Sequence, residues 1–118
     1  MLLLIGFAAP AVAQKNASKP DRGEAERNFV SSYVAGMILE EKCPTWRQDR
    51  VVVSLARSLF HFEDDVFQPG GRLHNEFMQQ VSFFRGKVGS LDRDWICDLA
   101  EQMFGPKGAI FPGWMKRR

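Results

Sequence analysis

The sequence predicts an all-α fold, a small domain of four helices cross-linked by one disulfide, with irregular N- and C-terminal segments. Apolar residues recur at helical spacing in four separate stretches, and clusters of glycine, proline or polar residues divide these stretches. With 118 residues, a hydrophobic share of 45% and an aromatic share of 12%, the chain has room for one domain with its own core.

Residues 1–13 form an uncharged apolar segment that ends in Ala11-Val12-Ala13. Small residues at this place are typical of a signal peptidase site, so we interpret residues 1–13 as a signal peptide that is cut before Gln14. The segment lacks a basic start and is shorter than the ~20 residues of a membrane span, which leaves a membrane anchor as the alternative. We expect a periplasmic or secreted bacterial protein, with residues 14–23 as a flexible leader and residues 24–118 as a single helical domain.

The first helix is expected over residues 24–42, where apolar pairs recur every four residues. These pairs are Phe29-Val30, Tyr33-Val34 and Met37-Ile38. The opposite side carries residues small enough to let another helix approach closely, namely Ala25, Ser32, Ala35 and Gly36. Pro44 ends this helix directly after Cys43.

The second helix is expected to follow a short connection over residues 45–48 and to extend to about Phe60, with Asp49 as its N-terminal cap. The consecutive valines 51–53 would also suit a strand, but the following residues have a helical period and no second strand is apparent to pair with it. The residues expected to face the core are Val52, Leu55, Ala56, Leu59 and Phe60.

The third helix is expected over residues 72–87, after the breaker Gln68-Pro69-Gly70-Gly71. Its inward residues would be Leu73, Phe77, Val81 and Phe84, flanked by Met78 and Phe83. The fourth helix is expected over residues 90–104, with an apolar stripe of Leu91, Trp95, Leu99 and Met103 that is widened by Ile96, Ala100 and Phe104. Residues 105–115 are too rich in glycine and proline for regular structure.

The two cysteines, Cys43 and Cys97, favour a disulfide, because exported domains oxidise their thiols. This bond would tie the end of the first helix to the fourth across 97 − 43 = 54 positions, and Trp46 and Trp95 would pack on it. Two unpaired thiols in a cytosolic protein are the alternative. In size, export and a single long-range disulfide, the chain is similar in outline to the periplasmic acid-stress chaperones of Gram-negative bacteria. That resemblance implies a chaperone that exposes apolar faces when its carboxylates become protonated.

The C-terminal residues combine an aromatic side chain with cations. The formal net charge is +2, of which Lys116, Arg117 and Arg118 supply three positive charges, so the rest of the chain offers no basic face for a nucleic acid. We expect the partner-binding residues to be Trp114, Met115, Lys116 and Arg117, and this segment could also contact an anionic membrane surface. The alternative is that Ile110, Phe111 and Trp114 fold back to cover helix ends.

No catalytic residue is expected, because the chain lacks a nucleophile elbow and Cys97 would be oxidised. A metal site is conceivable: His61, Glu63 and Asp65 alternate, and His74 follows across the Pro-Gly-Gly turn. The alternative is a solvated acidic corner, with Phe60, Phe62 and Phe67 entering the core. A pair of carboxylates for glycoside cleavage could be drawn from Glu63, Asp64, Asp65 and Glu76.

The leading hypothesis is therefore a small exported helical protein that acts as a non-enzymatic binding or interaction module with a protein partner and without a cofactor. Its alternatives are a periplasmic acid-stress chaperone and a small cell-wall hydrolase or metal-dependent enzyme that uses Glu63, Asp65 and the two histidines.

Overall fold

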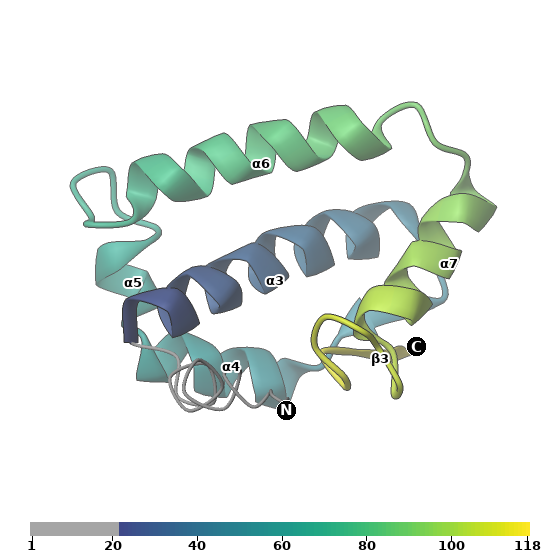
Figure 1. Ribbon diagram of the computed structural model, residues 1–118, viewed down its shortest axis with the longest axis horizontal. Coiled ribbons are helices and arrows are strands. Elements are labelled where there is room, and N and C mark those ends of the chain that lie inside the picture. Colours follow the sequence, from purple (N-terminus) through teal and green to yellow (C-terminus); the bar gives the residue numbers. More distant parts are fainter. Residues whose placement is uncertain (1–21) are drawn as a thin grey trace, which may run out of the picture.

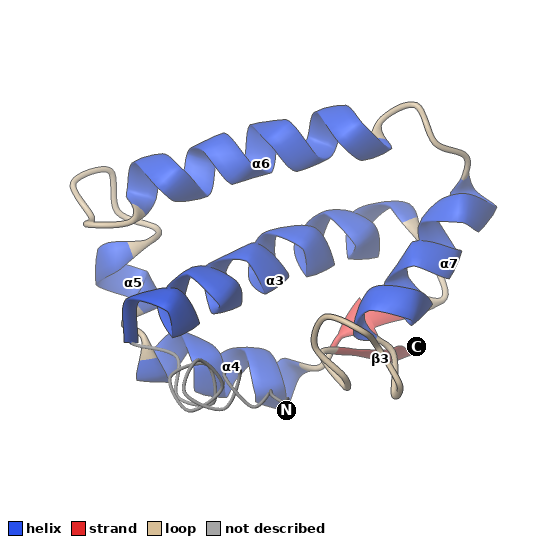
Figure 2. Cartoon of the chain, in the orientation of Figure 1, coloured by secondary structure: helices blue, strands red, loops and turns tan. Residues whose placement is uncertain are grey.

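The computed structural model describes residues 22–118, which contain five helices and a two-stranded antiparallel sheet (Figures 1 and 2). The predicted helical character and disulfide are confirmed, but the prediction of four helices without strands is wrong. The structure contains a short helix and two three-residue strands that were not predicted, and all three elements are too short to show a period in the sequence.

Helix α3 (Arg22–Lys42) lies at the centre of the molecule, between α6 on one side and α7 and the sheet on the other (Figure 1). It begins two residues before the predicted start, so the last two residues of the predicted leader are helical. The predicted signal peptide, residues 1–13, and the rest of the leader lie outside the described residues.

Two clusters of buried side chains share α3. One cluster contains Val30, Val34 and Ile38 of α3 together with residues of α5 and α6. The other contains Ala35 and Leu39 with residues of α4, α7 and the sheet. Since α3 is buried on two sides, both its apolar pairs and its small residues contribute to the core.

The sheet joins strands β2 (Trp46–Gln48) and β3 (Met115–Arg117), with Arg47 opposite Lys116. The backbone N–H of Asp49 extends the pairing by donating to the carbonyl of Trp114 at 2.8 Å. The sheet lies against the small-residue side of α3, where a helix was expected. A β-carbon on Gly36 would lie 2.5 Å from Gln48 Oε1, so this glycine permits the close approach.

Helix α4 (Arg50–Leu59) is capped as predicted, since Asp49 Oδ1 accepts hydrogen bonds from the N–H groups of Val51 and Val52. Its buried residues are Val53 and Ala56, whereas the predicted core residues Leu55 and Leu59 are exposed. Helix α5 (Phe62–Asp65) then reverses the chain from His61, whose φ of 53° lies in the left-handed region.

Helix α6 (His74–Val88) begins two residues and ends one residue after the third predicted helix, whereas helix α7 (Arg93–Phe104) begins three residues after the fourth predicted helix and ends with it. The buried face of α7 is Ile96, Ala100 and Phe104, and Trp95 is 58% exposed, so the predicted stripe is rotated. Residues 95 and 97 are about 200° apart around a helix. Cys97, which is bonded to the buried Cys43, therefore lies on the other side of α7 from Trp95.

Candidate functional site

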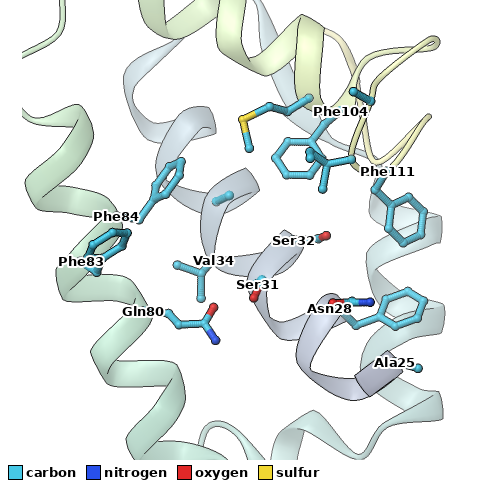
Figure 3. Close-up of a pocket in the computed structure, with 15 residues that line it drawn as sticks. Ala25, Asn28, Ser31, Ser32, Val34, Gln80, Phe83, Phe84, Phe104 and Phe111 are labelled. Atoms are coloured by element: carbon cyan, nitrogen blue, oxygen red, sulfur yellow. The ribbon is translucent and has the colours of Figure 1, made fainter. Parts of the chain in front are cut away.

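A groove of about 790 Å³ lies between α3, α6 and the chain that follows α7. In Figure 3, Phe83 and Phe84 of α6 lie on one side, Phe104 and Phe111 lie on the other, and Val34 and Ser31 of α3 lie between them. The residues that line it are Ala25, Asn28, Phe29, Ser31, Ser32, Val34, Ala35, Gln80, Phe83, Phe84, Met103, Phe104, Ala109, Ile110 and Phe111.

Helix α3 presents its polar and small residues to the groove at helical spacing. Asn28, Ser31, Ser32 and Ala35 follow one another at intervals that place them on one side of the helix. Ser32 and Ala35 belong to the side of small residues that the sequence indicated as a surface for another helix, and Asn28 and Ser31 extend that side. This run of small and polar residues is the signal in the sequence that could have indicated the groove.

The loop after α7 is held in place by backbone hydrogen bonds. The N–H groups of Ile110 and Phe111 both donate to the carbonyl of Met103 at 3.1 Å, and Gly113 N–H donates to Gly105 O at 2.9 Å. Phe111 then packs against Phe29, with ring centroids 5.3 Å apart. The wall of the groove formed by this loop is thus fixed to both α7 and α3.

The lining of the groove is apolar and uncharged. Five phenylalanines and Met103 supply the apolar surface, and Asn28, Gln80 and the two serines supply neutral hydrogen-bonding groups. Among the described residues that line it there is no histidine, cysteine, carboxylate or cationic side chain. The groove can therefore hold an apolar ligand, but it has no general base to activate a serine.

The four predicted metal-site residues do not converge on one point. His74 Nδ1 is 2.8 Å from the carbonyl oxygen of Val66, and the carboxylates of Glu63 and Asp65 accept hydrogen bonds from Arg57 and Arg72. His61 is exposed at the start of α5. Within residues 22–118, no group of three or more histidine, cysteine, aspartate or glutamate side chains could hold a metal ion.

Three of the four carboxylates suggested for glycoside cleavage are also engaged elsewhere, and the fourth, Asp64, is exposed. Glu63 forms an ion pair with Arg57 at 2.8 Å, and Glu76 forms one with Arg27 at 3.5 Å. Asp65 forms an ion pair with Arg72 at 3.1 Å. None of these carboxylates lines the groove described above.

The C-terminal segment differs from the expected exposed aromatic joined to cations. Trp114 and Met115 are buried, and the indole Nε1 of Trp114 donates to Gln48 Oε1 at 2.7 Å. Lys116 and Arg117 are exposed, with the guanidinium of Arg117 over the ring of Trp46. Of the four predicted partner-binding residues, only these two present their side chains to solvent.

The disulfide between Cys43 and Cys97 is formed, as predicted. Trp46 is buried in the adjoining cluster, as expected, whereas Trp95 is exposed. Disulfides are typical of proteins in oxidising compartments. Within residues 22–118, no helix combines the length and the apolar character that crossing a membrane requires.

In comparisons with known proteins, no protein-family model, curated protein or solved structure matches the chain.

Proposed function

We propose that the protein is a non-enzymatic binding module of an oxidising compartment such as the periplasm, and that it holds an uncharged apolar ligand in the groove between α3, α6 and α7. The observation that supports this proposal is the lining of the groove, which is aromatic and, within residues 22–118, free of charged side chains. Its volume of about 790 Å³ lies within the range of small-molecule sites.

The polar groups of the lining restrict the chemistry of the ligand. The amides of Asn28 and Gln80 and the hydroxyls of Ser31 and Ser32 can donate or accept a hydrogen bond, but none of them compensates a charge. Moving an ion into an apolar site without a counter-charge is unfavourable. The best ligand is therefore a neutral amphiphile that carries a hydroxyl or amide on a long apolar body.

The first test uses the neutral fluorescent probe N-phenyl-1-naphthylamine, whose emission rises in apolar surroundings. We expect saturable enhancement by the protein and displacement of the probe by competitors of matched chain length. Decanol should displace it at lower concentration than decyltrimethylammonium, because the lining formed by residues 22–118 offers no carboxylate to the cation. Equal displacement by the two compounds would contradict the proposed selectivity.

A matched pair of variants places the binding site. Phe83 lines the groove and is 64% exposed, and Leu55 on α4 is 60% exposed but outside it. We expect Phe83→Asp to weaken probe binding about tenfold or more, because a carboxylate then faces the apolar ligand. Leu55→Asp should leave probe binding unchanged. If the two variants bind the probe equally well, the groove is not the site.

The acid-stress chaperone remains the second candidate, and one ion-pair network favours it. The side chain of Glu26 is buried on α3 and accepts a hydrogen bond from Arg72 at 2.6 Å, and Arg72 also donates to Asp65 at 3.1 Å. Arg72 thereby ties α3 to the loop before α6. Suppression of client aggregation only below about pH 4, where carboxylates protonate, would support this candidate. Its absence throughout the acid range would remove it.

A further inference from the structure

Helix α4 carries a stripe of exposed aliphatic side chains that the groove does not use. Val51 is 67% exposed, Leu55 is 60% exposed and Leu59 is 61% exposed. The spacing of four places these residues one above another along a single side of the helix. Large apolar side chains that are exposed together in one line indicate a surface that another molecule covers.

The stripe is held rigidly in place by the rest of α4. Val53 and Ala56, on the other side of the helix, are buried in the core cluster that includes α7, and Asp49 caps the first turn. In Figure 1, α4 lies on the opposite side of α3 from α6. The stripe is therefore a preformed surface, separate from the groove between α3, α6 and α7.

The two ends of the stripe have opposite charge. Before α4, Arg47 lies directly opposite Lys116 in the sheet, and like charges in this position repel each other. After α4, helix α5 carries three consecutive carboxylates, and Asp64 is exposed. Within residues 22–118, neither Arg47 nor Lys116 nor Asp64 forms an ion pair, although both cations act on the carboxylate of Asp49 at the start of α4.

The charged groups lie near opposite ends of the stripe. In Figure 1 the sheet that carries Arg47 and Lys116 lies beside the start of α4, and α5, which carries Asp64, lies beside its end. A two-fold axis near Leu55 would set two copies of α4 antiparallel, with Leu55 against Leu55 and Val51 against Leu59. The same axis would bring the basic end of each copy to the acidic end of the other, as an isologous interface requires.

We propose that the exposed stripe of α4 is the interface of a two-fold symmetric homodimer, in which Asp64 of each copy meets the basic pair Arg47 and Lys116 of the other. A partner of a single charge sign would match only one end of the stripe, whereas a second copy matches both. Since α4 has ten residues and is about 15 Å long, the interface is small and the dimer is weak.

The test is sedimentation velocity of the disulfide-bonded protein between about 1 µM and 1 mM. We expect a monomer–dimer equilibrium with a dissociation constant on the order of 10–100 µM, as a small interface allows. Leu55→Asp should raise this constant at least tenfold, because the change enters the interface twice. Phe83→Asp adds the same carboxylate to an exposed position outside the interface and should leave the constant unchanged.

Charge reversal tests the register of the two copies. Arg47→Glu and Asp64→Lys should each weaken the dimer several-fold, and the double variant should recover most of that loss, because the reversed charges meet across the interface. The proposal is overturned by a wild-type protein that is monomeric throughout the concentration range. It is equally overturned if Leu55→Asp dimerises with the same dissociation constant as wild type, or if the double variant dimerises as weakly as the single variants. Circular dichroism of each variant establishes that it is folded.

Discussion

At the scale of single residues, Gly36 decides how closely the sheet approaches α3. A β-carbon at this position would lie 2.5 Å from Gln48 Oε1 and 2.8 Å from Trp114 Nε1, the two atoms of a buried hydrogen bond. The amide of Gln48 and the indole of Trp114 are both buried, so moving either side chain would break their hydrogen bond or disturb the core. Gly36 therefore couples the centre of α3 to the C-terminal segment.

The corresponding prediction compares two helical glycines. Gly36→Ala should lower the free energy of unfolding by about 1–3 kcal/mol, the usual cost of overpacking a core. Gly86 lies on α6 with open space around it, so Gly86→Ala should raise the free energy of unfolding by about 0.5–1 kcal/mol through helix propensity. Urea denaturation measures both changes. Stabilisation by both substitutions would show that the sheet can yield at Gly36.

At the scale of elements, α4 depends on the cap that begins it. The carboxylate of Asp49 accepts hydrogen bonds from the N–H of Val52 and the N–H of Val51, at 3.2 and 2.9 Å. The pKa of Asp49 is held below its ordinary value mainly by the hydrogen bond from Val52. The hydrogen bond from Val51 and the positive charges of Lys116 and Arg47 lower it further. The start of α4 is consequently linked to pH.

We expect Asp49→Asn to reveal this linkage. A carboxyl whose pKa is lowered by folding stabilises the folded protein at pH values above its unfolded pKa of ~4. That stability is lost as the pH falls through the folded pKa. Asparagine also caps helices, so the substitution removes mainly the charge. Wild type should be the more stable protein at pH 7, and the difference should disappear toward pH 2. Thermal unfolding across this range provides the measurement, and a difference that stays constant with pH would rule out the linkage.

Long periodic segments made four of the five described helices predictable from sequence. The missed elements, α5 and strands β2 and β3, have three or four residues each, too few for a period to appear. For α7 the helix was predicted but not its orientation. The pattern of Leu91, Trp95 and Leu99 is as regular as that of the buried face, yet Leu91 and Leu99 are only partly buried against the core and Trp95 is exposed.

The candidate site was not predictable for a related reason. The groove is assembled from α3, α6 and a loop more than twenty positions beyond α6, so no local pattern contains it. The sequence likewise left two interpretations of Trp114, exposed for a partner or folded back over helix ends, because its hydrogen-bond partner, Gln48, lies 66 positions away. Local patterns predict the elements, whereas surfaces formed between distant elements depend on how those elements pack.

At the scale of the whole molecule, α3 is the element that both core clusters share, and the disulfide reinforces only one of them. Cys43 belongs to the cluster formed with α4, α7 and the sheet, whereas the cluster of Val30, Val34 and Ile38 contains no residue of α7. The disulfide therefore secures the α7 wall of the groove to the end of α3. The α6 wall is held by the other cluster.

Removing the disulfide should consequently cost stability and weaken ligand binding together. Cys43→Ala with Cys97→Ala frees a loop with a sequence separation of 54, for which chain entropy predicts a loss of about 4 kcal/mol in the free energy of unfolding. Chemical denaturation of this variant, and of wild type with and without dithiothreitol, measures that loss. In native buffer, the affinity for the neutral naphthylamine probe should also fall, because the α7 wall is no longer tied to α3. If the reduced protein unfolds at the same denaturant concentration as the oxidised one, the buried contacts of α7 hold that wall without the disulfide.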